Sequence, residues 1–193
     1  MVFERRCVSC TTVGTSPCAC CIARLRPCAE ASVEGLDRCL VVVEYDDMSR
    51  AIIGALKYRG VRSVAQWLGT AMAERVVRAG EQPDVVTWVP ATPRNRRRRG
   101  FDQGQLLASV VARRLSIPTT AVARRSRGPS QTGRSREQRL AGPQLRRRGH
   151  CIDKQRCVLI VDDVLTTGAS LGAVGALLEA QERCVAVVAA RRQ

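Results

Sequence analysis

Residues 158–170 read Val158-Leu-Ile-Val-Asp-Asp-Val-Leu-Thr-Thr-Gly-Ala-Ser170, and this stretch decides the fold. Its first four apolar residues predict a strand that is buried on both faces, as in a parallel sheet. Two carboxylates follow, and then hydroxyls and a glycine at the start of a helical pattern. Parallel sheets bind ligands beyond the carboxyl ends of their strands, and a helix that begins there attracts anions. We therefore interpret the stretch as the phosphate-binding turn of an α/β protein.

The paired carboxylates Asp162 and Asp163 predict a sugar phosphate as the ligand. They would repel a bare polyphosphate, but ionised carboxylates accept hydrogen bonds from hydroxyl groups. Gly168 lets the backbone approach a phosphate closely. A nucleotide-binding P-loop would require Gly-Lys-Ser/Thr, which is absent here. The alternative interpretation is a plain strand–helix turn with surface aspartates.

All thirteen positions of this stretch resemble the phosphoribosyl-pyrophosphate (PRPP) binding motif of type I phosphoribosyltransferases. The resemblance implies that the two acidic residues contact the ribose diol and that the following residues bind the 5-phosphate. It implies catalytic roles for Asp162 and Asp163 and a Mg²⁺ ion that accompanies PRPP. The expected PRPP-binding residues, which we call the phosphate loop, are Asp162, Asp163, Val164, Leu165, Thr166, Thr167, Gly168, Ala169 and Ser170.

Strand and helix patterns alternate on both sides of this stretch. We expect strands at 40–45, 85–89, 119–123, 157–161 and 184–189. We expect helices at 49–59 (with Ser49 as N-cap), 61–79, 103–115 and 169–180. This order predicts a parallel twisted sheet of the type I phosphoribosyltransferase kind, covered by helices on both faces. Residues 1–38 are expected to form a small zinc-ribbon-like segment, and residues 39–193 the phosphoribosyltransferase-like domain.

A narrower resemblance, to the ComF family of competence-associated proteins, covers nearly the whole chain. Its motifs are Tyr45…Ile52…Leu56-Lys57-Tyr58-Arg59-Gly60, Val89-Pro90, Arg99-Gly100-Phe101-Asp102-Gln103, Gln131 and the phosphate loop. The family's usual Asn is Asp102 here, so a carboxylate replaces an amide donor. The resemblance implies a role in DNA uptake, with single-stranded DNA and other DNA-uptake proteins as partners. The alternative is a nucleobase phosphoribosyltransferase of purine or pyrimidine salvage.

In phosphoribosyltransferases a loop after an earlier strand binds pyrophosphate, and residues 90–94 occupy that place here. Ala91 and Thr92 can offer hydrogen-bond donors, and the guanidinium of Arg94 suits the charge of pyrophosphate. Lys57 and Arg59 are further candidates, although cations at the end of a helix are also favoured by its dipole. A Pro-rich turn with a solvated arginine is the alternative.

The chain has ten cysteines, six of them within the first 28 residues, and it has no signal peptide or long apolar run. We therefore expect a cytoplasmic protein that does not span a membrane, in which cysteines bind metal instead of forming disulfides. The spacing Cys7-x2-Cys10 and Cys18-x2-Cys21 predicts one structural zinc site. Cys20 and Cys28 leave the second pair open, and an unmetallated tail is the alternative.

The chain has 32 basic and 17 acidic residues and a net charge of +15, which favours an anionic partner. Basic residues cluster at 94–99, 124–139 and 146–148, and the middle cluster falls where phosphoribosyltransferases carry a flexible substrate loop. Single-stranded DNA also suits such segments, although aromatic residues for base stacking are scarce. The candidate nucleic-acid residues are Arg96, Arg97, Arg98, Arg99, Arg124, Arg125 and Arg127. A solvated basic surface is the alternative.

Overall fold

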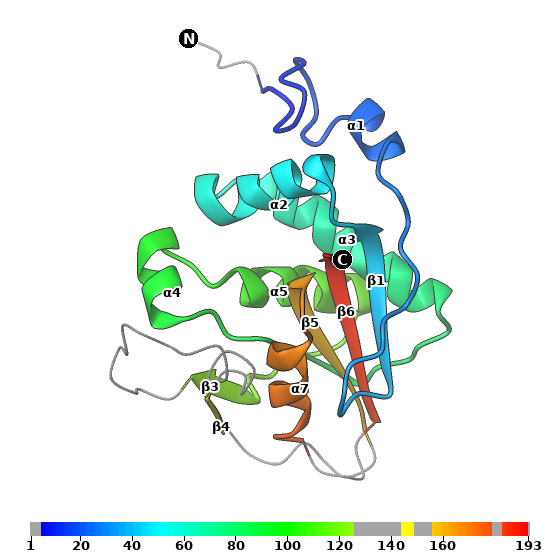
Figure 1. Ribbon diagram of the computed structural model, residues 1–193, viewed down its shortest axis with the longest axis vertical. Helices are drawn as coiled ribbons and strands as arrows, with labels where there is room; N and C mark the ends of the chain where they lie inside the picture. The colour runs from blue at the N-terminus through cyan, green and yellow to red at the C-terminus, as the bar shows by residue number, and fades with distance from the viewer. Residues whose placement is uncertain (1–4, 126–143, 149–155, 179–182, 193) are drawn as a thin grey trace.

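A computed structural model describes residues 5–125, 144–148, 156–178 and 183–192 of the chain. Its centre is a sheet of four parallel strands (Figure 1). In spatial order these are β1 (Arg38–Glu44), β6 (Arg183–Arg191), β5 (Cys157–Leu165) and β2 (Val85–Trp88). The carboxyl ends of all four strands therefore lie at one edge of the sheet. The predicted α/β fold with a parallel sheet is confirmed.

Helices cover both faces of this sheet because its central strands are apolar on both sides. On one face, α2 (Asp47–Arg59), α3 (Arg62–Arg78) and α5 (Gln103–Leu115) share a core with Leu159 and Val161. On the other face, α7 (Ala169–Gly175) packs against Ile160. Successive strand residues point to opposite faces, so β5 contributes to both cores. No helix in the part of the chain that the structure describes has the length and apolar content needed to cross a membrane.

The start of α2 corrects the predicted N-cap. Asp46 is the capping residue, and its side chain accepts a hydrogen bond from the backbone N–H of Ser49. The hydroxyl of Ser49 accepts one in return from the N–H of Asp46, which completes a capping box. Ser49 is therefore the third helical residue, and not the cap. Gly60 ends the helix in the left-handed conformation, as its position predicted.

Two regions differ from the predicted elements. The strand expected at 119–123 is reduced to one parallel bridge between Thr119 and Val86, preceded by Pro118, which cannot donate to a strand ladder. The chain then enters β3 (Ala123–Arg125), which pairs antiparallel with β4 (Leu145–Arg147).

The short helix α4 (Pro93–Arg99) was not predicted, because none of its residues is buried and it has no apolar periodicity. Thr92 caps it and Pro93 is its first residue, which is a favoured helix start. The helix expected at 169–180 is shorter than predicted: α7 ends at Gly175 and residues 176–178 form a turn, while residues 179–182 lie outside the described part of the chain.

The N-terminal segment, which includes α1 (Ala19–Ala23), is tied to the sheet by residues 26–36, here called the strap. Pro27 and Ala31 form antiparallel bridges with β1 and so cover its outer edge. The strap then crosses α7 at very short range. A Cβ atom on Gly172 would lie 2.9 Å from the backbone oxygen of Glu34, and one on Gly175 would lie 2.9 Å from that of Gly35. The division into a zinc-ribbon-like segment (1–38) and a phosphoribosyltransferase-like domain (39–193) remains a prediction.

Gly172→Ala should lower the free energy of unfolding by about 1–3 kcal/mol, because the added methyl group meets backbone that cannot turn aside. Gly54→Ala in α2 is the matched control, since its Cβ would meet only the Tyr58 ring at 3.9 Å. That change should be neutral or stabilising by up to about 1 kcal/mol. Urea unfolding of both variants measures the difference, and equal effects would contradict the close packing of the strap on α7.

Candidate functional site

The phosphate loop lies where the sequence placed it, at the carboxyl edge of the sheet between β5 and α7. Strand β5 is longer than predicted and continues through Leu165, so both aspartates belong to the strand itself. Thr166 and Thr167 are exposed, and Gly168 has a φ of 78°, a conformation that favours glycine. A hollow of about 40 Å³ is lined by Asp162 and residues 164–171.

The two aspartates point to opposite faces of the sheet, as consecutive strand residues must. Asp163 is buried and turns towards α2, where its Oδ1 lies 2.8 Å from the Lys57 Nζ. Asp162 is half-buried on the side of the hollow, and its Oδ1 accepts a hydrogen bond from the Asp163 N–H. The sequence predicted both residues but not this separation of their carboxyl groups. Their contacts with ribose remain a prediction.

Asp162 differs from an ordinary carboxyl group in its protonation. Burial and the neighbouring Asp163 carboxylate raise the pKa of Asp162 to about 8. The N–H of Asp163 and the charges of Lys57 and Arg125 oppose this shift without cancelling it. Asp162 therefore holds a proton more strongly than an ordinary carboxyl group does, and in its protonated form it can donate a hydrogen bond as well as accept one.

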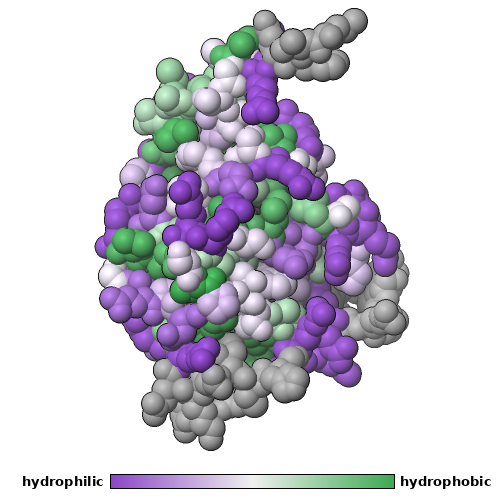
Figure 2. Space-filling model, turned by 180° about the vertical axis from the view of Figure 1, so that it is seen from behind, coloured by the Kyte–Doolittle hydropathy of each residue, from purple (hydrophilic) through white to green (hydrophobic). Residues whose placement is uncertain are grey.

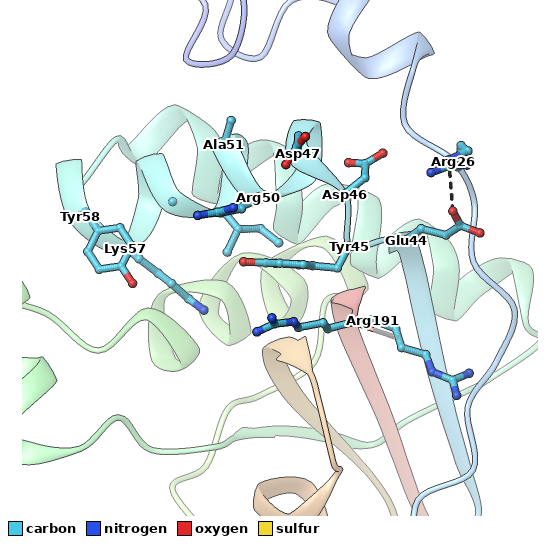
Figure 3. A pocket seen from close by; sticks show the side chains of 13 residues that line it. Arg26, Glu44, Tyr45, Asp46, Asp47, Arg50, Ala51, Lys57, Tyr58 and Arg191 are labelled. Carbon is cyan, nitrogen blue, oxygen red and sulfur yellow. Dashed lines mark ion pairs between the residues drawn. The ribbon is translucent and has the colours of Figure 1, made fainter.

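Next to the loop lies a cavity of about 1300 Å³ between α2 and the ends of β1 and β6. Figure 3 shows Tyr45, Arg50 and Lys57 extending into the same space. At its rim, Arg26 forms an ion pair with Glu44 at 3.1 Å. Its helical wall consists of Asp47, Arg50, Ala51, Ile53, Gly54, Lys57 and Tyr58. Lys57 belongs to this wall and also contacts Asp163, so the cavity and the phosphate loop share one side chain.

The sequence did not reveal this cavity, although its signal is present. Asp47, Arg50, Ala51, Gly54 and Tyr58 recur at helical spacing opposite the buried face of α2. A polar helix face with two small residues at its centre is normally solvated. Here the ends of β1 and β6 lie opposite this face and make it the wall of a cavity, which the sequence of the helix does not show.

The predicted pyrophosphate residues are partly engaged within the protein. The Ala91 N–H donates to Asp102 at 2.9 Å, and the hydroxyl of Thr92 accepts from the Asn95 N–H as the cap of α4. Arg59 donates to the backbone oxygen of Val8 at 3.1 Å. Arg94 is exposed on the first turn of α4. Their contact with pyrophosphate remains a prediction.

The carboxylate of Asp102 has a structural use that an amide could fill only in part. Its Oδ1 accepts from the N–H groups of Gly104 and Gln105 and so caps α5. Its Oδ2 accepts from the Ala91 N–H, which joins the loop after β2 to the start of α5. Three hydrogen bonds to one carboxylate explain why an acidic residue suits this position.

The described parts of the three basic clusters lie on α4, on β3 and on β4, which carries Arg146 and Arg147. Arg96, Arg97 and Arg98 are exposed on α4, whose edge of the molecule is covered mainly by hydrophilic residues (Figure 2). Arg124 and Arg125 belong to β3, and the Arg125 Nε donates to the backbone oxygen of Pro90 at 2.9 Å. Arg127 and most of the cluster at 124–139 lie outside the described residues.

The structure brings together the four cysteines that the spacing predicted. The Sγ atoms of Cys7, Cys10, Cys18 and Cys21 lie within 4.8 Å of one another, whereas Cys20 and Cys28 are not part of the group. The Cys7 and Cys21 Sγ atoms are 3.8 Å apart, and those of Cys10 and Cys18 are 3.5 Å apart. Tetrahedral zinc with Zn–S bonds of about 2.3 Å requires sulfur atoms about 3.8 Å apart. The donor set and its spacing therefore fit a zinc ion.

The protonation of these thiols is uneven. Burial would raise the pKa of Cys7, but backbone N–H donors, led by that of Cys10, outweigh it and lower the pKa to about 6. Burial beside the other thiols raises the pKa of Cys21 to about 12. Zinc binding would displace the remaining protons, because the thiolate is the metal ligand.

Comparison with known families supports the interpretation of the C-terminal half. Residues 102–193 match the model of the phosphoribosyl transferase domain. This region begins at the cap of α5 and includes β5, the phosphate loop and β6. It is phosphoribosyltransferase-like, in agreement with the broader of the two resemblances. The narrower resemblance to the ComF family remains a prediction. No curated protein matched the chain.

Solved structures with some similarity include two transferases. Adenine phosphoribosyltransferase from Leishmania donovani is 16% identical, with a TM-score of 0.48 over 84% of this chain and 86% of that one. Purine phosphoribosyltransferase from Pyrococcus horikoshii is 19% identical, with a TM-score of 0.41 over 66% and 82% of the two chains. A hypothetical protein from Neisseria gonorrhoeae with bound ppGpp is 18% identical, with a TM-score of 0.42. The chain spans 65% of that protein, slightly less than two thirds.

Protein purified without chelator should contain about one zinc ion per chain, held by the four clustered thiols. Cys21→Ser should abolish this zinc, because serine replaces one of four required thiolates. Cys20→Ser is the matched control one residue away, and it should keep the metal because Cys20 is exposed and outside the cluster. Elemental analysis measures the zinc content of both variants. An iron–sulfur absorption band, or equal zinc in both variants, would contradict the assignment.

Proposed function

We propose that this protein binds PRPP through its phosphate loop as a phosphoribosyltransferase-like protein. The observation that carries the proposal is the complete thirteen-residue motif, Val158 to Ser170, within a region that matches the phosphoribosyl transferase domain. The position of the loop at the carboxyl edge of a parallel sheet, beside a hollow, supports the same assignment.

In this proposal, Thr166 through Ser170 bind the 5-phosphate, and Asp162 and Asp163 bind the ribose hydroxyls. Asp163 accepts, while the protonated Asp162 can exchange hydrogen bonds in both directions. Lys57 fixes Asp163 in place before the ligand arrives. Magnesium prefers oxygen ligands, and these two carboxyl groups together with pyrophosphate oxygens offer a suitable set once Asp162 has lost its proton. When bound, Mg²⁺ would neutralise charge on the departing pyrophosphate.

Two versions of this function differ in what happens after PRPP binds. In the first, which the ComF resemblance favours, the protein binds PRPP and takes part in DNA uptake. In the second, a nucleobase displaces pyrophosphate in a purine or pyrimidine salvage reaction, and catalysis is mainly positioning and charge stabilisation. Pyrophosphate release across a panel of nucleobases separates the two, because only the second version releases it.

Asp163→Asn should weaken PRPP binding in the presence of Mg²⁺ by at least tenfold, because an acceptor of a charge-assisted hydrogen bond is removed, at about 1.5–3 kcal/mol. Isothermal titration calorimetry measures the affinity. Asp47→Asn, an equal charge change at an exposed site in the cavity wall, should bind PRPP nearly as the parent does. A thermal melt of each variant confirms folding. Unchanged PRPP affinity in the folded Asp163→Asn variant would contradict the assignment of the phosphate loop as the PRPP site.

We also propose that the exposed arginines of α4 bind single-stranded DNA weakly and with little sequence preference. The binding constant should fall with salt because association releases counterions. Changing Arg96 and Arg97 to Ala should reduce the slope of log K against log salt by about 0.7 for each phosphate that the protein no longer neutralises. The control changes Arg62 and Arg78 to Ala, two exposed residues of α3. Absence of binding at low salt would contradict this proposal and would leave phosphorylated metabolites or solubility as the use of the basic charge.

A further inference from the structure

Buried polar atoms without a hydrogen-bond partner are concentrated in one part of the described chain. They belong to three residues: Arg99 (Nε and Nη1), Gln103 (Oε1) and Asp163 (Oδ2). More than nine in ten buried polar groups in proteins are hydrogen-bonded, so each exception calls for an explanation. Three exceptions close together share one explanation more readily than three separate ones.

The last turn of α2 brings these residues together. Lys57 and Tyr58 are consecutive there, and Lys57 contacts Asp163 at 2.8 Å. The guanidinium carbon of Arg99 lies 5.6 Å from the centre of the Tyr58 ring. A Cβ on Gly60 would lie 3.8 Å from the Phe101 ring, so the chain between Arg99 and Gln103 packs against the end of the same helix. Arg99 and Asp163 are therefore both neighbours of the last turn of α2, Arg99 through Tyr58 and Asp163 through Lys57.

The chemistry of the unpartnered atoms determines which groups a ligand must carry. The two nitrogen atoms of Arg99 are donors on a cation, and they require an anion such as phosphate. The oxygens of Asp163 and Gln103 are acceptors that require hydroxyl or N–H donors. A phosphorylated sugar carries both kinds of group within one small molecule. A DNA strand has phosphates but lacks sugar hydroxyls along its length, so it satisfies only half of the set.

We propose that Arg99 binds the pyrophosphate group of PRPP while Asp163 binds the ribose hydroxyls of the same molecule. This inference rests on the proposed function and adds a residue to its site. Arg99 closes α4, whose other end carries Thr92 and Arg94. The Thr92 hydroxyl is used as the cap and the Ala91 N–H is bound to Asp102, whereas the Arg99 donors have no partner among the described residues. The pyrophosphate therefore lies at the C-terminal end of α4.

Arg99→Met tests this proposal, because methionine keeps the apolar stem and removes the donors. PRPP affinity should fall about ten- to a hundredfold, the usual effect of losing charge-assisted hydrogen bonds. Affinity for ribose 5-phosphate, which lacks pyrophosphate, should stay within about twofold, since Arg99 makes no contact with it. The melting temperature of the free protein should not fall, because the variant removes buried donors that have no partner.

Arg98→Met is the matched comparison. Arg98 loses the same charge and lies over the same ring at 5.5 Å, but its side chain is exposed. It should weaken PRPP binding far less than Arg99→Met does. Arg99→Lys, which keeps the charge without the planar fork, should fall between the parent and Arg99→Met, and it provides the comparison if the methionine variant does not fold.

The outcomes separate this proposal from the proposed function. If the parent binds PRPP and both arginine variants bind it equally well, Arg99 is not a pyrophosphate ligand, although the function stands. If the parent does not bind PRPP, the proposed function fails, and inorganic pyrophosphate then probes Arg99 directly. If the parent binds pyrophosphate and Arg99→Met does not, the result supports an anion site at Arg99 but not the binding of PRPP. Equal pyrophosphate affinity in parent and variant, or no binding at all, would overturn it.

Discussion

The ion pair between Lys57 and Asp163 joins the two parts of the structure on which the candidate site depends. Asp163 lies near the carboxyl end of the buried strand β5, and Lys57 lies in the last turn of α2, which covers that strand. A buried carboxylate needs a partner of opposite charge, because removal from water is otherwise too costly. Lys57 contacts Oδ1 of Asp163, whereas Oδ2 has no hydrogen-bond partner among the described residues. The same lysine lies in the wall of the large cavity, so the cavity and the phosphate loop share this side chain.

The N-terminal segment supports the site from the opposite face of the sheet. The strap covers the edge of β1 and then lies against the glycines of α7, close to the phosphate loop. A Cβ on Gly168 would lie 2.9 Å from the Val33 side chain, so this glycine serves the packing of the strap as well as the turn itself. The cysteine cluster packs at the other end of the segment, where Arg59 donates to Val8. Zinc at the cluster would therefore stabilise the segment that holds both α2 and the loop.

The sequence was sufficient where one local pattern determines one structure. Four apolar residues followed by Asp162 and Asp163 predicted the strand and its turn, and paired cysteines predicted the cluster. It failed where the determining contact is distant in the chain. One error is local: Ser49 and Asp46 both belong to residue types that favour the N-cap position, and Asp46 makes the bond. No local pattern marks Arg38 and Arg183, which bind the buried Glu81 and join the starts of β1 and β6. Arg99 was grouped with its exposed neighbours, and only burial separates it from them.

A crystal structure of the protein with PRPP and Mg²⁺ tests the central claim most directly. We predict the 5-phosphate among residues Thr166 to Ser170, with the ribose hydroxyls on Asp162 and Asp163 and with Lys57 still in contact with Asp163. PRPP bound in the cavity between α2 and β6, with no ligand atom on the phosphate loop, would contradict this prediction. In that case the thirteen-residue motif would be only a strand–helix turn.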